Sequence, residues 1–406
     1  MTLDIDFVRG QVPAISEPSL QGQAFFENAG GSFACAPVID RLTRFYRSRK
    51  VQPHGPYEAS RLAGEEMDEA RQRLSAMLGV APDELSFGPS TTQNAHVLAQ
   101  AFREWLGEGD AMIVTDQDHE ANSGPWRRLA ASGIEIREWR IDRDTGLLRL
   151  EDLENLLDES VRLVCFPHCS NIVGAINPVT EITAAAHASG AFVCVDGVSY
   201  APHGLPPVGA MGPDIYLFSA YKTYGPHQGL MVIRRELGQL LPNQAHWFNA
   251  DVLYKRFTPA GPDHAQVAAC AGMADYYDAL AAHHGIAGDA AERTQGMHAL
   301  FRAHETALLQ PLLDFLGNRN SARLLGPREA DAKAPTVAVE LPTPGVAAAE
   351  QLAHHGIMAG GGDFYGGRPL QAMGVDPQKG VLRLSFVHYT RQAEVEQLIE
   401  ALNSVI

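Results

Sequence analysis

Apolar runs of strand length alternate with amphipathic stretches over the first 233 residues of the chain. Between these runs, apolar residues recur at helical spacing, for example over 65–78, 121–132 and 179–189. Strands that are apolar throughout and alternate with helices are typical of a mostly parallel sheet with helices on both faces. The pattern therefore predicts an α/β fold whose large domain contains a mostly parallel seven-stranded sheet flanked by helices. The expected strands are 83–87, 111–115, 134–139, 161–167, 191–196, 215–219 and 230–233.

The rest of the chain predicts a second, smaller unit. Helical spacing over 263–284 and 290–316 is followed by strand-like runs at 336–340 and 381–386, with helices at 346–355 and 393–405. We expect residues 1–23 to form an irregular arm, and we expect the glycine-rich run 360–367 to form a flexible loop. We therefore predict an N-terminal arm (1–23), a large domain (24–285) and a small C-terminal α/β domain (286–406).

The composition of the chain limits which partners the protein could bind and in which cellular compartment it is expected. The formal net charge of -16 argues against nucleic acid and anionic membrane surfaces, because both need clustered lysine and arginine. No apolar run approaches the ~20 residues of a membrane span, and the chain does not open with a secretory leader, so we expect a cytoplasmic protein. The five cysteines are odd in number and lie in apolar surroundings, as reduced, buried thiols do.

Polar residues follow four of the predicted strands, at 116–119, 167–171, 196–199 and 219–222. Ligands of such sheets bind beyond the carboxyl ends of the strands, so these segments are expected to converge. Lys222 follows an apolar run and is flanked by Tyr221 and Tyr224. Burial would lower the pKa of its amine and make it a nucleophile. The alternative is a strand-end lysine whose ammonium reaches out to solvent.

Two further segments could approach a ligand. The run 88–95 places hydroxyl side chains before a predicted helix, whose free N–H groups suit a phosphate. Capping of that helix by Ser90 or Thr91 is the alternative. The glycine pair Gly30-Gly31 follows a short apolar stretch and would let backbone lie close to a bound molecule.

A lysine, an aspartate at a neighbouring strand end, a histidine and a phosphate cradle together suit pyridoxal 5'-phosphate. That cofactor needs an amine for its aldehyde, an acid at its ring nitrogen, a flat group over the ring and donors for its phosphate. Asp196 lies 26 positions before Lys222, which leaves room for one connection and one strand. With Ser219-x-x-Lys222 and Thr91-Thr92, this arrangement resembles the class V aminotransferases of PLP fold type I, which include cysteine desulfurases. The resemblance covers nearly the whole chain.

The resemblance implies roles for the matching residues. Lys222 matches the catalytic Schiff-base lysine, Asp196 the partner of the pyridine nitrogen, and His119 the histidine stacked over the ring. Arg383 matches the arginine that clamps a substrate carboxylate, for which a planar fork is suited; a buried ion pair is its alternative role. The other expected cofactor-binding residues are Thr91, Thr92, Asn171, Ser199, Ser219, Tyr221 and Gly261, and the other expected substrate-binding residues are Asn28 and Ala29.

Four features depart from the desulfurase pattern, and one of them, the glycine content of the run 360–367, implies a differently shaped pocket. Ser199 stands where desulfurases carry a glutamine near the ring hydroxyl, and Ala260-Gly261 stands where the partner subunit's Gly-Thr helps to hold phosphate. Gly362-Asp-Phe-Tyr365 replaces the loop that carries the persulfide cysteine, and none of the five cysteines lies in it. A persulfide mechanism needs a reactive thiolate beside the substrate sulfur. The chain thus looks most like a cysteine desulfurase-like subgroup that lacks this cysteine.

The resemblance implies a PLP-dependent lyase that acts on a small amino acid with a leaving group, expected to be sulfur, at Cβ. The products would be aminoacrylate, then pyruvate and ammonia. The alternatives are an aminotransferase or epimerase of the same family, and a PLP-binding partner protein without activity. The resemblance also implies a homodimer with shared active sites, each completed by partner residues near 256–264.

Other reactive side chains are expected to be structural. His119 with Asp116 and Asp118 lacks a second histidine at ligand spacing, so no metal is expected. Cys165 and Cys169 are expected to pack around a strand end. Four histidines near strand ends are expected to be hydrogen-bonded structural residues; these are His203, His227, His264 and His388.

Overall fold

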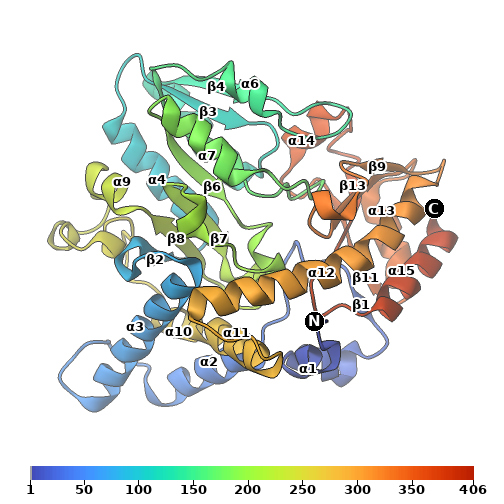
Figure 1. The fold of residues 1–406 in the computed structure, drawn as a ribbon, viewed down its shortest axis with the longest axis horizontal. Helices are drawn as coiled ribbons and strands as arrows, with labels where there is room; N and C mark the ends of the chain where they lie inside the picture. The colour runs from blue at the N-terminus through green and yellow to red at the C-terminus, as the bar shows by residue number, and fades with distance from the viewer. Residues whose placement is uncertain (1) are drawn as a thin grey trace.

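The computed structural model describes residues 2–406 and has a large central sheet between layers of helices (Figure 1). The sheet has seven strands in the order β2-β8-β7-β6-β5-β3-β4. β8 runs antiparallel to both of its neighbours, and the other adjacent pairs are parallel. The predicted seven-stranded, mostly parallel sheet is confirmed. Its strands are β2 (Leu85–Gly88), β3 (Ala111–Thr115), β4 (Glu135–Trp139), β5 (Val161–Pro167), β6 (Phe192–Asp196), β7 (Ile215–Ser219) and β8 (Gly229–Ile233).

Both faces of this sheet are buried, which is why its strands read as continuous apolar runs. In β7, Ile215 and Leu217 join one hydrophobic core, whereas Tyr216 and Phe218 join the other. This division follows from the two-residue period of a strand. Helices cover both faces; they are α2 (Ala36–Ser48), α3 (Glu58–Leu78), α4 (Thr91–Trp105), α5 (Glu120–Arg127), α6 (Leu150–Glu154), α7 (Val179–Ala188), α8 (Val208–Met211), α9 (Arg235–Leu240), α10 (His264–Ala269) and α11 (Ala271–His283).

The C-terminal part forms a smaller α/β unit around an antiparallel sheet in the order β12-β13-β10-β9. A two-stranded parallel pair, β1 with β11, lies with this unit, because Ala24 and Phe26 belong to its hydrophobic core. The elements are β1 (Ala24–Phe25), β9 (Arg323–Leu325), β10 (Thr336–Glu340), α13 (Gly345–Ala353), β11 (Ile357–Met358), β12 (Gly360–Gly362), α14 (Gly367–Ala372), β13 (Val381–Ser385) and α15 (Gln392–Val405).

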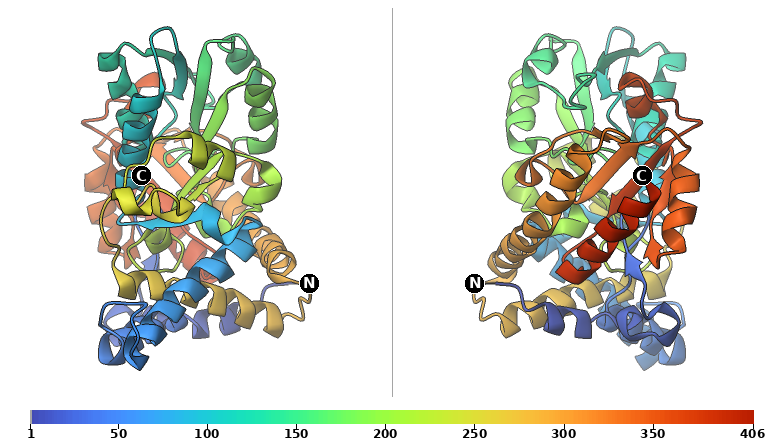
Figure 2. Two further views of the ribbon diagram at one scale, coloured as in Figure 1. Left: turned by 90° about the vertical axis from the view of Figure 1, so that its left-hand side faces the viewer. Right: turned by 90° about the vertical axis from the view of Figure 1, so that its right-hand side faces the viewer.

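The long helix α12 (Ala290–Gly317) joins the two units. Its first half contributes Met297 and Phe301 to the core below the large sheet, and its second half contributes Leu309 and Leu313 to the core of the small unit. Figure 2 shows it running diagonally between the units, and it packs against α15 at its far end. The predicted boundary between the domains, after residue 285, stays a prediction. Helix α12, which begins shortly after that residue, packs against both units.

Several local expectations were wrong. Within the predicted irregular arm, of which residue 1 lies outside the described residues, Asp4 caps a short helix α1 (Ile5–Gly10). The first three residues of the glycine-rich run 360–367 form a paired strand, β12, where Gly361 lies so close to the backbone of Gly345 that a Cβ would clash. The helix expected over 121–132 ends at Arg127 and continues as a 3-10 turn, and the one expected over 263–284 divides at Cys270. Helix α2 was not expected.

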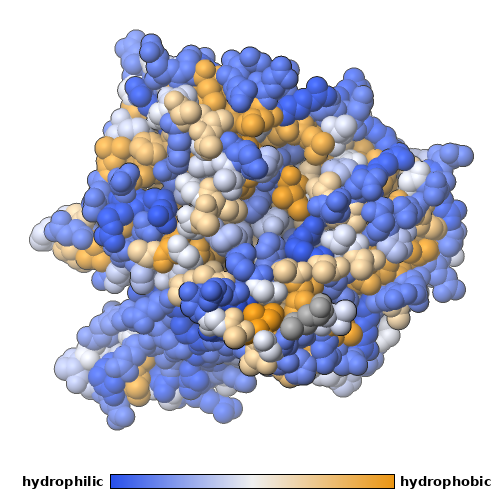
Figure 3. All heavy atoms as spheres, viewed as in Figure 1, coloured by the Kyte–Doolittle hydropathy of each residue, from blue (hydrophilic) through white to orange (hydrophobic). Residues whose placement is uncertain are grey.

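The outside of the molecule agrees with its composition. Hydrophilic residues cover much of the face seen in Figure 3, with apolar residues in smaller groups between them. Within residues 2–406, no helix combines the length and the apolar character that crossing a membrane requires.

Close backbone packing aligns β8 with the start of α4. A Cβ on Gly229 would lie 2.4 Å from the carbonyl carbon of Ser90 and 2.7 Å from the backbone nitrogen of Thr91. Backbone on both sides leaves no flexible side chain that could yield. We predict that Gly229→Ala destabilises the fold by about 1–3 kcal/mol and displaces the start of α4. Thermal unfolding checks this, with Gly10→Ala as the control because a Cβ there meets nothing within 4 Å. Equal melting temperatures for the two variants would contradict the prediction.

Candidate active site

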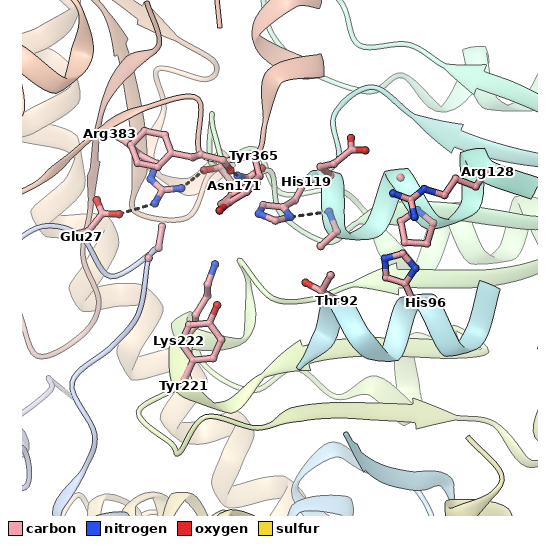
Figure 4. A pocket seen from close by; sticks show the side chains of 17 residues that line it. Glu27, Thr92, His96, His119, Arg128, Asn171, Tyr221, Lys222, Tyr365 and Arg383 are labelled. Carbon is pink, nitrogen blue, oxygen red and sulfur yellow. Dashed lines mark hydrogen bonds and ion pairs between the residues drawn. The ribbon is translucent and has the colours of Figure 1, made fainter. Parts of the chain in front are cut away.

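A cavity of about 550 Å³ lies at the carboxyl ends of the strands, where the large and small units meet (Figure 4). Side chains reach it from β13, from the start of α4 and from the segments that follow β5 and β7. The convergence expected from the strand ends is observed for the segments 116–119, 167–171 and 219–222, whereas no residue of 196–199 lines this cavity. Seven of the predicted site residues line the cavity: Ala29, Thr92, His119, Asn171, Tyr221, Lys222 and Arg383.

Lys222 follows β7 in a 3-10 turn, and its amine points into the cavity (Figure 4). The residue is only 9% exposed, so the alternative of a side chain that reaches out to solvent is wrong. Burial, reinforced by the positive charge of Arg383, lowers the pKa of the amine to about 8, although the charges of Asp196 and Glu27 oppose this shift. A sizeable fraction of the amine is therefore unprotonated near neutral pH and able to act as a nucleophile or base.

Asp196 ends β6, the strand next to β7. Its carboxylate is buried and accepts a hydrogen bond of 2.8 Å from the backbone N–H of Val198. Burial raises the pKa of Asp196 to about 6, while that hydrogen bond and the charge of Lys222 act in the opposite direction. The carboxylate is thus ionised at neutral pH and can hold a protonated ring nitrogen.

The start of α4 and the end of β7 place two hydroxyl groups together. The Thr91 and Ser219 hydroxyl oxygens lie 2.8 Å apart. Ser90 caps the helix by accepting from the backbone N–H of Gln93, so the capping alternative holds for Ser90 and does not use Thr91. Thr92 lies at the cavity. Hydroxyl groups at a helix start, where N–H groups are unpaired, suit a phosphate.

His119 caps α5 through its ring. Its Nδ1 accepts from the backbone N–H of Ala121 at 3.0 Å, and the ring points into the cavity (Figure 4). Burial and the charges of Lys222 and Arg383 lower the pKa of His119 to about 3. The imidazole is therefore neutral at physiological pH, and a neutral flat ring is suited to stacking on an aromatic cofactor.

Arg383, on β13, forms the buried ion pair considered as its alternative role. Its Nη2 donates to Glu27 at 2.8 Å, so the ion pair exists, and its Nη1 donates to the backbone oxygen of Asn171 at 3.2 Å. The ring centroid of Phe364 lies 3.7 Å from the guanidinium carbon. The Nε of Arg383 is buried without an acceptor among residues 2–406. A free N–H on a buried guanidinium fits an anionic ligand, so carboxylate binding stays a prediction alongside the ion pair.

The residues present fit pyridoxal 5'-phosphate. The Oδ1 of Asn171 is buried and has no hydrogen-bond partner within the described chain, while its Nδ2 donates to the backbone oxygen of Phe364. Buried polar atoms normally have partners, so this oxygen, like the Nε of Arg383, indicates a bound group. An amine, a neutral imidazole and the Thr92 hydroxyl line the cavity. The Asp196 carboxylate ends the strand next to β7, and the paired hydroxyls of Thr91 and Ser219 lie at the start of α4 and the end of β7, which completes the set of groups that the cofactor requires.

Six predicted residues do not line the main cavity. Thr91, Asp196 and Ser219 lie at the strand and helix ends described above, and the other three line other cavities. Ser199 and Asn28 line a small adjoining cavity on another side of Lys222, and the Oδ1 of Asn28 accepts from the hydroxyl of Tyr389 at 2.9 Å. Gly261 lines a separate cavity together with Tyr254. The roles assigned to these three residues stay predictions.

Sequence reasoning missed several residues that line the cavity. Glu27 belongs to the segment that ends in the glycine pair Gly30-Gly31, and no role was predicted for it. An acidic residue that directly follows an apolar run is a signal that could have indicated a site residue. Phe364 and Tyr365 have positive φ angles of 51° and 54°, which bulky residues rarely adopt and which no local pattern indicated. The remaining unpredicted lining residues include His96, Glu120 and Arg128.

The other reactive side chains have structural surroundings. His203 contacts Glu305 at 3.0 Å and His388 contacts the hydroxyl of Tyr276 at 2.8 Å, so the prediction of hydrogen-bonded structural histidines is confirmed for these two. Cys165 and Cys169 are buried, like the other cysteines. Within residues 2–406, no group of three or more His, Cys, Asp or Glu side chains is arranged to hold a metal ion.

Comparison with known proteins agrees with this geometry. Residues 24–398 match the family model described as aminotransferase class-V. The chain belongs to the class V aminotransferase family. It is 32% identical to an aminotransferase-like protein of Gibberella zeae over 100% of this chain and 99% of that protein. A cysteine desulfurase of Serratia proteamaculans is 35% identical, over 60% of this chain and 61% of its own length.

Solved structures show the same fold. The apo structure of a cysteine desulfurase from Thermococcus onnurineus superposes with a TM-score of 0.85 and 23% identity, covering 100% of this chain and 98% of the other. A cysteine desulfurase from Escherichia coli gives a TM-score of 0.81 and 21% identity, covering 100% and 99%. PLP fold type I is confirmed. The class V family depends on pyridoxal 5'-phosphate, so this chain is a PLP-dependent enzyme.

The low pKa of Lys222 is open to direct measurement. In the cofactor-free protein, acylation of Lys222 by an amine-reactive reagent should increase with pH with a midpoint near 8, since only the unprotonated amine reacts. Peptide mass spectrometry at each pH gives the extent of labelling, and the exposed Lys50 serves as the internal control. A Lys222 midpoint near the ordinary lysine value of about 10.4 would show that the amine is solvated.

Proposed function

We propose that this class V enzyme is a lyase that eliminates a sulfur group from Cβ of cysteine or a cysteine derivative without a persulfide cysteine. The observation that carries the proposal is a buried, low-pKa Lys222 facing Arg383 in a cavity that no cysteine of residues 2–406 lines. A base and a carboxylate site in one cavity suit chemistry at the Cα and Cβ of an amino acid. The desulfurase relatives support a cysteine-like substrate.

The cofactor would be held by residues already described. Lys222 would bind its aldehyde, Asp196 its ring nitrogen and Asn171 its ring hydroxyl, with His119 over the ring. When bound, the cofactor supplies an electron sink for the charge left at Cα after a proton departs. The phosphate would be held by the Thr91, Thr92 and Ser219 hydroxyls and the N–H groups at the start of α4.

The chain's own side chains would position the substrate and move its proton. Arg383 would hold the substrate carboxylate through the Nε that now has no acceptor, and this fixes the direction in which the Cα–H bond points. Lys222, once replaced by the substrate's amine, would take the Cα proton on Nζ and then donate it to the departing sulfur. A pKa of about 8 suits both steps, because the amine can hold and release a proton near neutral pH.

The cysteines support direct release of sulfur rather than a persulfide route. All five are buried, and burial raises the pKa of the Cys35 and Cys169 thiols to about 12. Thiols of this kind are poor nucleophiles, because the thiolate is the reactive form. Phe364 and Tyr365 line the cavity from the segment that carries the persulfide cysteine in desulfurases.

The competing functions predict different products. An aminotransferase of this family, a candidate favoured by the relative named aminotransferase-like, would move the amino group to a 2-oxo acid. An epimerase would release the amino acid with the opposite configuration at Cα and would form neither pyruvate nor ammonia. A PLP-binding partner protein without activity would leave the cofactor absorbance unchanged on mixing with amino acids.

We predict that holoenzyme incubated with cysteine, cystine and S-substituted cysteines releases pyruvate and ammonia from at least one of them. Lys222→Ala should reduce the rate by at least ~100-fold, because general acid–base groups contribute about 10²–10⁴-fold. Pyruvate is measured by coupled reduction, and Lys379→Ala, which changes a lysine away from the cavity, is the control. Transfer of the amino group to a 2-oxo acid with no pyruvate from any substrate would favour the aminotransferase.

We also propose a homodimer with shared sites. Gly261 does not reach the main cavity of its own chain and lines a separate cavity of about 390 Å³, as expected if it completes the partner's site. In the same region Trp247 is 85% exposed and Phe248 is 63% exposed. Large exposed aromatic residues are unusual on a monomer and are enriched in protein–protein interfaces. A second copy of the chain is the occupant that these two observations favour.

Trp247→Glu should shift the protein from dimer to monomer in sedimentation velocity, because a charge would be buried at the interface. Leu147→Glu places the same charge on another exposed apolar residue, outside this region, and should leave the dimer intact. A wild-type protein that sediments as a monomer with full cofactor occupancy would count against shared sites.

A further inference from the structure

Glu27 lines the cavity at its edge, beside Arg383 (Figure 4). It follows β1 and forms an isolated bridge with Ser385, which lies two residues beyond Arg383 on β13. Its Oε1 accepts from the Nη2 of Arg383 at 2.8 Å. Figure 4 shows the carboxylate beside the guanidinium, on the same side of the cavity as the Lys222 amine.

Two glycines make room for this carboxylate. A Cβ on Gly30 would lie 2.7 Å from Oε1 of Glu27, and a Cβ on Gly360 would lie 2.4 Å from Oε2. Those distances are too short for non-bonded atoms, so any larger residue at either position would displace the carboxylate. Oε2 is also buried without a hydrogen-bond partner in the described part of the chain. A charged oxygen left in that state is costly, which suggests that its position serves the site rather than the fold.

A bound amino acid would lie within the field of this charge. Its amine would replace Lys222 and its carboxylate would lie on the free Nε edge of Arg383, next to the Nη2 that Glu27 already occupies. The Glu27 charge also acts on Lys222, whose pKa it raises. A substrate that spans these two residues therefore lies between two groups on which the Glu27 charge acts.

We propose that Glu27 is a specificity-determining residue that excludes amino acids with a second carboxylate and favours those with a neutral or cationic side chain. The proposal rests on the proposed function in one respect, that Arg383 takes the substrate carboxylate. In a diacid such as aspartate, two carbon atoms separate the carboxylates. The second carboxylate would then share one buried guanidinium with the first and with Glu27, leaving negative charge unpaired.

The chain contains a matched control. Glu120 lines the same cavity, but it is paired with Arg368 at 3.3 Å and its side chain is 49% exposed. Solvent screens an exposed carboxylate, so its charge has little effect on a substrate at Arg383. Glu27→Gln and Glu120→Gln therefore remove the same charge from two places and keep the size of the side chain.

The experiment measures binding to holoenzyme by titration of the cofactor absorbance with L-alanine, L-aspartate and L-2,3-diaminopropionate. Glu27→Gln should improve the affinity for aspartate relative to alanine by at least about tenfold, or ~1.4 kcal/mol, and reduce the preference for diaminopropionate. Glu120→Gln should change these ratios by less than about twofold. Near-UV circular dichroism of each variant verifies that the cavity is intact.

Two results would overturn the proposal. If the ratios of affinity between the three amino acids are unchanged in Glu27→Gln, the charge of Glu27 does not affect which substrate binds. Equal weakening of all three amino acids would mean that Glu27 only holds Arg383 in position. The three probes carry no sulfur leaving group, so a shifted ratio without lyase activity would refute the proposed elimination and leave the role of Glu27 standing. A wild-type holoenzyme that releases pyruvate from a cysteine derivative but binds aspartate as tightly as alanine would refute the role of Glu27 and leave the proposed elimination standing.

Discussion

The site depends on the burial of one amine. Lys222 loses most of its hydration at the end of β7, and the cost of burying its charge lowers its pKa. Asp196 on the neighbouring strand and Glu27 from the N-terminal segment offset part of that cost, while Arg383 adds to it. The balance leaves a lysine that is neither permanently charged nor permanently neutral, which is the condition for carrying a proton near neutral pH.

Neither unit of the molecule contains the site alone. The large sheet supplies Lys222, Asp196 and the hydroxyls near the start of α4, because parallel strands end at a common edge. The small unit supplies Arg383 and Phe364, and Glu27 comes from a segment that packs with that unit. Helix α12 extends through both cores and fixes the units relative to each other. The distance between the amine and the guanidinium is therefore set by packing far from the cavity.

The segment Asp363–Gly366 has no regular secondary structure. Its two residues with strained backbone, Phe364 and Tyr365, are each fixed by a hydrogen bond to the large unit. Phe364 and Tyr365 are both left-handed, at about 1–3 kcal/mol each for residues of this kind. The Phe364 oxygen accepts from Asn171 and the Tyr365 oxygen accepts from the backbone N–H of Glu120. These bonds to the large unit hold Phe364 against Arg383. The Phe364 ring thus forms part of the cavity wall beside Arg383.

The sequence by itself determined the sheet, its strand ends and the main reactive residues. Apolar runs and helical periods are local properties, and the rule that parallel strands end at one edge converts them into a prediction of which side chains meet. Lys222, Asp196 and His119 were found in this way, and Thr91 was found from the hydroxyl side chains at the start of a predicted helix. Short helices such as α1 and the strand at Gly360–Gly362 escaped detection, because capping and glycine backbone packing overrode their composition.

Only the tertiary structure decided the contacts on the substrate side. Glu27 and Arg383 are 356 positions apart, and nothing in the neighbourhood of either indicates the other. The pairing of Asn171 with Phe364 and the separation of Gly261 from the main cavity likewise depend on how the two units pack. Hydrophobic periodicity indicates which face of a helix or strand is buried. The partner of a buried charge depends instead on how elements that are distant in the chain pack against each other.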